Sequence, residues 1–246
     1  MIHDNNTTYE QRIAELEAEG MTTSDAQGVA DAEIRKKKML ATMFAVIINP
    51  IELEAVSLAA SKEETRYYMN GVYVENYEGG HALIATDGHR MHSIGIRPIE
   101  AAKGGFILGN DDIKKALSMA KAEKLPKHSS DAVRIRIDAD ELKISIKIIV
   151  VDKEGDSVRE CGSFTSKAID GTFPDYRRLI PAISEAAVGC LLSFNAAYIA
   201  DFGKAAKLLS SPRSQIKITS SGIHNPVLIE LPCCESFTGV LMPMRF

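Results

Sequence analysis

The sequence contains no apolar run that approaches the roughly 18 residues a helix needs to cross a membrane. Its first ten residues, Met1 to Glu10, are polar and lack the hydrophobic segment of a secretory signal. The four cysteines show no CxxC metal-type spacing, and the adjacent pair Cys233 and Cys234 is not expected to form a disulfide with itself. The other two are Cys161 and Cys190. These absences predict a cytoplasmic protein whose thiols are reduced.

Catalytic signatures are also missing. There is no Walker loop, no dinucleotide-binding glycine fingerprint and no GxSxG motif, so nucleotide and acyl chemistry are not indicated. Four potential metal ligands lie close together in the sequence: His81, Asp87, His89 and His92. No further carboxylate or cysteine spacing completes a metal site. Asp170 and Asp175 could be paired carboxylates, but capping of the turn between them explains both. We therefore expect no enzyme activity, no metal and no cofactor.

The chain has 246 residues and a net charge of −4. This length fits one or two domains with a sizeable core. A negative total charge disfavours a surface covered with nucleic-acid contacts, but it is compatible with a local basic face.

Residues 1–42 differ from the remainder and are predicted to form a helical N-terminal extension. Two capping-box spacings, Thr7–Glu10 and Thr22–Asp25, each predict the start of a helix. Gly20 is placed to end the first helix. The second helix is expected to end in the basic run 35–38, which either contacts phosphates or is a solvated helix end suited to the helix dipole.

From residue 43 onward, one pattern occurs three times: a short apolar strand runs into asparagine and then into an amphipathic helix. The asparagines are Asn49, Asn110 and Asn195, and asparagine is a favourable N-cap. Strands with alternating apolar residues follow each helix. They are predicted at 66–75 and 81–87, at 133–137 and 142–148, and at 215–218 and 226–231. The body is therefore predicted to be α+β, built from three strand–helix–strands half-units.

One half-unit cannot bury its sheet and its helix alone. Two half-units are therefore expected to share a core, with both helices on one face of a joined antiparallel sheet. Three copies leave one half-unit unpaired, and either another chain or the N-terminal extension must cover it. The number of repeats thus predicts a homo-oligomer.

Three segments are distinctive: RYYMNG (66–71) followed by ATDGHRM (85–91), FTSKAIDGTFPDYRRLIP (164–181), and VLMPMRF (240–246). In this order they resemble the start of the middle domain, the end of that domain with its linker, and the extreme C-terminus of the bacterial sliding clamp, the β subunit of DNA polymerase III. The resemblance covers roughly residues 44–246. It implies the DNA-clamp, or processivity, fold, with helices on one face of antiparallel sheets.

A clamp of this family has three domains, or six half-units, whereas this chain has three half-units. The resemblance implies that residues 43–182 form one complete clamp-like domain and that residues 183–246 form half of another. Residues 1–42 stand where the family has its first domain. The family's head-to-tail dimer interface uses the first and last domains, so that interface does not carry over.

In the family, polymerases and other partners insert a short peptide into a cleft between the middle and last domains. The resemblance implies such a cleft here, with Met, Leu and Val as adaptable apolar contacts and arginines at the rim. Its members are Met69, Thr86, Gly88, His89, Arg90, Met91, Pro174, Arg178, Leu179, Phe194, Val240, Leu241, Met242, Pro243, Met244 and Arg245. The alternative is that the apolar members are core between half-units.

The resemblance also implies a DNA-facing surface along the helices. Its members are Arg66, Tyr68, Lys114, Lys115, Lys121, Lys124, Lys204 and Lys207. Lysines on one face would contact phosphates of double-stranded DNA without reading sequence. A solvated lysine face and strand packing of Arg66 and Tyr68 are the alternatives. Glu52 and Glu54 on the first helix of the body would repel DNA.

Two functions remain open. The first is a non-catalytic processivity factor that binds DNA polymerase III and other clamp-binding proteins and encircles DNA as an oligomer of about four chains. The second is a non-ring adaptor or decoy that keeps the peptide cleft and does not encircle DNA. The mass in solution distinguishes the two.

Overall fold

The computed structural model consists of two compact units, Met1–Phe44 and Ala45–Phe246. The residues it describes are 9–27, 44–77, 80–96, 104–125, 131–139, 143–154, 156–181, 192–209, 215–220, 222 and 225–244. No helix within these ranges is both long and apolar enough to span a membrane.

The N-terminal unit contains α1 (Tyr9–Ala18) and a second helical stretch at 23–27. The predicted capping box is present at the second helix, because the Asp25 amide donates to Thr22 Oγ1 and the Thr22 hydroxyl donates to the Asp25 carboxylate. Leu16 and Ala26 are buried together in a small cluster. Thr7 and the basic run 35–38 lie outside the described residues.

The first half-unit opens with β1 (Phe44–Ile48) and α3 (Pro50–Ser57). The Ile51 amide donates to Asn49 Oδ1 at 3.0 Å, and Pro50 occupies the first helical turn, so the predicted N-cap is confirmed. After α3 come the 3-10 helix η1 and three strands. They are η1 (Glu64–Met69), β2 (Gly71–Tyr77), β3 (Gly80–Thr86) and β4 (Arg90–Ile94).

The strand predicted at 66–75 begins five residues late, because residues 66–69 are part of η1. Asn70 fixes this helical turn: its side chain donates to the Glu63 carbonyl and its amide donates to the Tyr67 carbonyl. Gly71 then lies so close to the Leu108 backbone that any β-carbon there would clash.

The second half-unit repeats the order of the first. It contains β5 (Gly104–Gly109), α4 (Asn110–Ala122), β6 (Ala132–Ala139), β7 (Ile144–Val151) and β8 (Ser157–Ser166). The N-cap prediction is wrong for Asn110, since Gly109 is the N-cap residue of α4. The Asn110 side chain instead donates to the Ser61 carbonyl at 2.8 Å, which connects this helix to the loop after α3.

A linker with the short 3-10 helix η2 (Tyr176–Leu179) leads toward the third half-unit, which contains α5 (Ala196–Leu209), β9 (Lys217–Thr219), β10 (Val227–Leu231) and β11 (Cys234–Leu241). The Ala197 amide donates to Asn195 Oδ1 at 2.9 Å, as expected for an N-cap.

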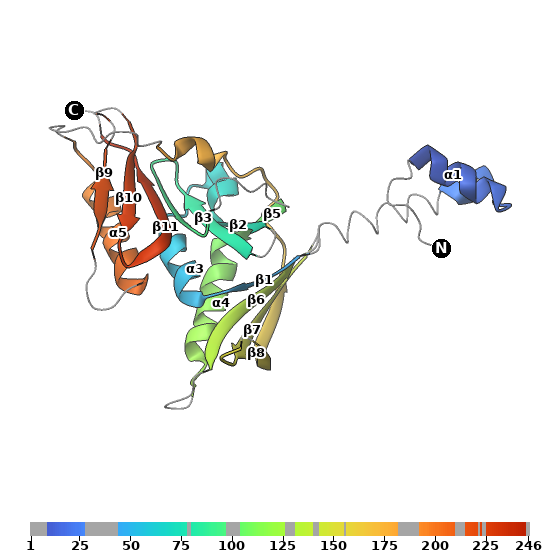
Figure 1. Cartoon of the computed structure of the whole chain (residues 1–246), viewed down its shortest axis with the longest axis horizontal. Coiled ribbons are helices and arrows are strands. Elements are labelled where there is room, and N and C mark those ends of the chain that lie inside the picture. Colours follow the sequence, from blue (N-terminus) through green and yellow to red (C-terminus); the bar gives the residue numbers. More distant parts are fainter. Residues whose placement is uncertain are drawn as a thin grey trace. The chain divides into compact units, whose positions relative to one another are not determined.

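The strands form two sheets, with the orders β1-β6-β7-β8 and β5-β2-β3-β4-β11-β10-β9 (Figure 1). The prediction of one joined sheet for the first two half-units is therefore wrong. Each of them instead donates its leading strand to the other's sheet: β1 joins β6, and β5 pairs with β2. The long joined sheet connects the first and third half-units, through antiparallel pairing of β4 with β11.

Helices cover the inner faces of these sheets, and α3 packs against both α4 and α5. The buried helical residues are Leu53, Ala55 and Val56 from α3, Ile113, Ala116, Leu117 and Ala120 from α4, and Phe202, Ala205 and Ala206 from α5. The α+β prediction, with helices against antiparallel sheets, is confirmed.

Candidate protein and DNA interaction site

The β4–β11 ladder brings two of the sequence motifs together. Met91 is opposite Val240 and Arg90 is opposite Leu241 in the antiparallel register. Just beyond the ladder, the Met242 amide donates to the His89 carbonyl at 3.0 Å. Motif residues that are about 150 positions apart in sequence are therefore direct neighbours.

A third motif, the linker, packs on the same place. Met91 and Val240 are buried in a cluster with Tyr176, and Phe173 and Ile180 pack against that cluster. The remaining buried members are Tyr77, Ala82 and Ile84. The geometry thus joins all three segments on which the resemblance rests.

The predicted cleft residues differ widely in burial. Met69, Thr86, Met91, Val240 and Leu241 are core, as the alternative interpretation held. Leu179, Met242 and Met244, in contrast, are 37%, 39% and 54% exposed. Pro174, Phe194 and Pro243 are half-buried, Gly88 and His89 are exposed, and Arg245 lies outside the described residues.

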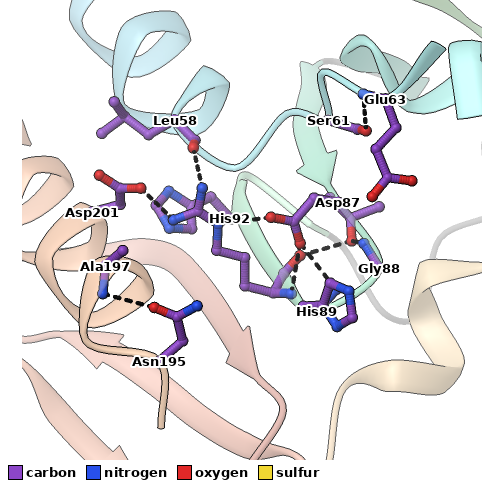
Figure 2. A network of polar contacts seen from close by, with 12 residues as sticks. Leu58, Ser61, Glu63, Asp87, Gly88, His89, His92, Asn195, Ala197 and Asp201 are labelled. Carbon is purple, nitrogen blue, oxygen red and sulfur yellow. Dashed lines mark hydrogen bonds and ion pairs between the residues drawn. The ribbon is translucent and has the colours of Figure 1, made fainter.

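A tight turn fixes the Asp87–Arg90 segment (Figure 2). Asp87 Oδ1 accepts from the amides of His89 and Arg90 at 2.9 and 3.1 Å. Thr86 Oγ1 accepts from the Gly88 amide and donates to the Arg90 carbonyl. Gly88 has φ +88°, a conformation that a side chain would strain.

Arg90 was expected at the rim of the cleft, but its side chain is only 9% exposed. Its Nε donates to Asp87, one terminal nitrogen to Asp201 of α5, and the other to the Leu58 carbonyl at 2.9 Å. Its guanidinium also lies 4.5 Å from the centre of the Tyr198 ring. Arg90 therefore connects the first and third half-units internally.

Asp201 completes this network. Burial alone would raise the pKa of its carboxyl, but hydrogen bonds from Lys204 and Arg90 hold that pKa below its usual value. The carboxylate is therefore charged at neutral pH and balances the partly buried guanidinium.

Glu75 anchors the linker to β2 from its buried position. Its carboxylate accepts two hydrogen bonds from Arg177, at 2.9 and 2.8 Å, and one each from the hydroxyls of Tyr77 and Tyr176. Burial alone would raise the pKa of Glu75, but these hydrogen bonds lower it. Arg178, the next residue, remains 85% exposed and forms an ion pair with Asp175.

An open pocket of about 770 Å³ lies where α3, α4 and α5 meet. Its lining includes four carboxylates and four Lys or Arg side chains, namely Glu54, Glu63, Asp87 and Asp201, and Lys62, Arg90, Lys114 and Lys204. This balance gives the pocket no strong attraction for an anion.

The predicted DNA-facing lysines do not share one environment. Lys114, Lys121 and Lys204 are exposed but pair with Asp111, Glu54 and Asp201. Lys115 lies over the Phe164 ring of β8, with its nitrogen 4.2 Å from the ring centre. Lys124 and Lys207 are exposed at the helix ends. Arg66 is exposed beside Gly88, and Tyr68 is half-buried.

His92 was considered as a metal ligand, and its environment is that of a core residue. It is fully buried, its Nδ1 lies 2.9 Å from the Ala55 carbonyl, and its ring lies against Phe202 and Phe237. Burial lowers the pKa of His92 to about 4. Within the part of the chain that the structure describes, no three His, Cys, Asp or Glu side chains are arranged to hold a metal ion.

Comparison with known proteins agrees with these features. Residues 45–175 match the family model of the DNA polymerase III beta subunit, central domain. The beta sliding clamp of Caulobacter vibrioides (strain NA1000 / CB15N) is 33% identical over 135 residues, which are 52% of this chain and 31% of that protein. The clamp of Rickettsia felis is 32% identical over 148 residues, 60% of this chain and 34% of that protein.

The likeness in fold extends further along the chain. A solved structure of Caulobacter crescentus pol III beta matches 83% of this chain and 67% of that one, with a TM-score of 0.60 and 22% sequence identity. The sequence match, by contrast, spans about a third of the curated relatives' length. The chain belongs to the bacterial sliding-clamp family, through the central domain of the DNA polymerase III β subunit.

Proposed function

We propose that the chain is a non-catalytic, clamp-like processivity factor. It binds a short peptide of DNA polymerase III or another replication protein and, as an oligomer, holds double-stranded DNA without reading its sequence. The observation that carries this proposal is the β4–β11 ladder, which assembles the three motif segments around buried Met91 and Val240. We also propose that residues 43–182 form one complete clamp-like domain and that residues 183–246 form half of another.

The peptide-binding surface is formed by Leu179, Met242 and Met244. These three are among the few large apolar side chains exposed in the described part of the chain. In sequence they follow closely after two members of the buried cluster, Tyr176 and Val240. Flexible thioethers suit a surface that accepts several related peptides. Exposed Arg178 is placed to pair with an acidic residue of the partner, a contact that internally engaged Arg90 cannot easily offer.

Peptide binding can be measured by fluorescence anisotropy with a labelled clamp-binding peptide of a replicative polymerase. Met242→Ala is expected to weaken binding about fivefold, since partial burial of a Met side chain is worth about 1 kcal/mol. Met21→Ala is the matched control, because Met21 is also 39% exposed but belongs to the N-terminal unit. Absence of binding by the wild type, or equal loss in both variants, rejects the proposal.

DNA holding is tested by retention on a nicked circular plasmid and release when the plasmid is cut. The double variant Lys114→Ala/Lys121→Ala should lower retention, because both lysines are exposed on α4, whereas Lys153→Ala/Lys167→Ala should not. A monomer or dimer that binds the peptide without being retained on DNA would identify a non-ring adaptor instead.

A further inference from the structure

The third half-unit lacks a strand that both other half-units have. In the first two, the strand after the helix is covered on its outer edge by the leading strand of the other half: β2 by β5, and β6 by β1. The equivalent strand of the third half-unit is β9. It is the last strand of the seven-stranded sheet, and the described residues place no strand beyond it (Figure 1).

Ile218 of the edge strand β9 is exposed where the other half-units bury apolar side chains. Ile218 of β9 is directly opposite Ile229 of β10, so both side chains point to the same face of the sheet. Ile229 is fully buried on that face, against the region of Phe202 and Gly239, whereas Ile218 is 45% exposed. In contrast, the equivalent strands of the other half-units each bury two apolar side chains of one face completely. These are Val72 and Val74 of β2, and Ile135 and Ile137 of β6.

The chain also carries a leading segment that has not been exchanged. Residues 192–194 precede Asn195 as β1 precedes Asn49, yet they join no sheet of a second half-unit. They make an isolated antiparallel bridge, in which the Met244 amide donates to the Ser193 carbonyl at 2.8 Å. Because successive residues of an extended strand direct their backbone groups to opposite edges, Leu192 and Phe194 point their amides and carbonyls away from Met244.

We propose that two copies of this chain exchange these segments about a twofold axis, with residues 192–194 of each copy adding to β9 of the other. Each added segment runs antiparallel to β9, as β5 runs to β2. The two third half-units then form one complete clamp-like domain shared between the chains. The interface is isologous, so a single edge and a single segment serve both copies.

The internal repeat identifies a second copy as the occupant of this edge. A strand edge pairs with an extended segment, and the apolar residues Leu16 and Ala26 of the N-terminal helices are already buried in their own cluster. The missing element is a half-unit's leading strand, and this chain supplies one. The inference rests on sheet topology and is independent of peptide or DNA binding.

The mass in solution, measured by sedimentation equilibrium, tests the exchange. The wild type is expected at an even multiple of 26.8 kDa, and Ile218→Lys at half the wild-type mass. Ile47→Lys is the matched control, because Ile47 is 43% exposed on β1 in a completed half-unit, and it should keep the wild-type mass. A monomeric wild type, or an Ile218→Lys variant of unchanged mass, overturns the proposal.

A second variant probes the donated segment. Leu192→Pro removes an amide that points toward the partner and should also halve the mass, without touching β9. When the two variants are mixed, a pair can form with one chain of each kind. In that pair the unaltered segment of the Ile218→Lys chain meets the unaltered β9 edge of the Leu192→Pro chain, so one of the two contacts is intact. Such pairs should associate more strongly than either variant alone, by at least tenfold in Kd. If mixing restores no association, the contact between copies is not a reciprocal strand exchange.

Discussion

Replacing His92 by asparagine should make the stability of the fold less sensitive to acid. His92 is buried at the interface between the first and third half-units. His92 lies where α3, β4, α5 and β11 meet, and its neutral ring donates from Nδ1 to the Ala55 carbonyl. The Nδ2 of asparagine occupies nearly the position of the histidine Nδ1 and keeps this hydrogen bond. The variant therefore loses the titratable ring and little of the polar contact.

The size of the effect follows from the pKa of His92. Burial is the main cause that lowers it, from 6.5 to about 4, while the Ala55 carbonyl and the carboxylates of Asp201 and Asp87 oppose the shift and Arg90 adds to it. A lowered pKa means that the unfolded chain binds the proton more readily, so stability falls as the pH drops below 6.5. Between pH 8 and pH 5 this residue should cost the folded state about 2 kcal/mol, and roughly 3 kcal/mol once the pH is below 4.

Urea denaturation followed by circular dichroism at pH 8 and pH 5 measures this loss. The asparagine variant starts less stable, by about 2 kcal/mol because of the cavity, but should lose about 2 kcal/mol less than the wild type between the two pH values. Contributions from His81 and the carboxylates are common to both proteins and cancel. Equal losses in the two proteins, or an NMR titration of His92 with a midpoint above pH 6, would refute the reasoning.

Two further substitutions test the linker anchor and the open face of α5. Glu75→Gln leaves the Arg177 guanidinium without its carboxylate and should destabilise the fold by about 2 kcal/mol in urea denaturation at pH 7, whereas Glu63→Gln, in an exposed pair, should cost under about 0.5 kcal/mol. Because the pKa of Glu75 is lowered, the stabilisation by its carboxylate is present above pH 4.5 and is lost as the pH falls through the folded pKa. Glu75→Gln should lack this loss. An equal fall in the free energy of unfolding with pH in both proteins would contradict the argument. Gly203→Ala should raise stability by about 1 kcal/mol in thermal denaturation, since an added β-carbon meets no atom within 4 Å and alanine favours helix. A destabilised Gly203→Ala would mean that this face of α5 is covered.

The sequence predicts local structure well where local chemistry determines it. The strand predicted at 133–137 lies within β6, and the strand predicted at 142–148 overlaps β7 from Ile144 onward. The asparagine caps of α3 and α5 are present. The cap at Asn110 fails because Ser61, 49 residues earlier, offers its side chain a better partner. That contact is tertiary, and no local pattern reveals it.

Strand pairing and site geometry are harder to predict from the sequence. An apolar leading strand such as β1 or β5 fits either sheet, so the exchange between half-units leaves no trace in periodicity. The strands β4 and β11, which assemble the candidate site, also escaped a prediction based on alternation. The resemblance placed Arg90 at the rim of the cleft. Its internal contacts with Asp201 and the Leu58 carbonyl depend on tertiary structure, and no local pattern predicts them.

The β4–β11 ladder has a consequence for how the protein is made. Ser93 donates to the Thr238 carbonyl across 145 residues of sequence, so this contact has a very high contact order. During synthesis, the first half-unit can form while β4 still presents an unpaired edge, and that edge is covered only after β11 has been made. Loss of β11 would leave β4 open to edge-to-edge aggregation, so a strand of the third half-unit protects the sheet of the first.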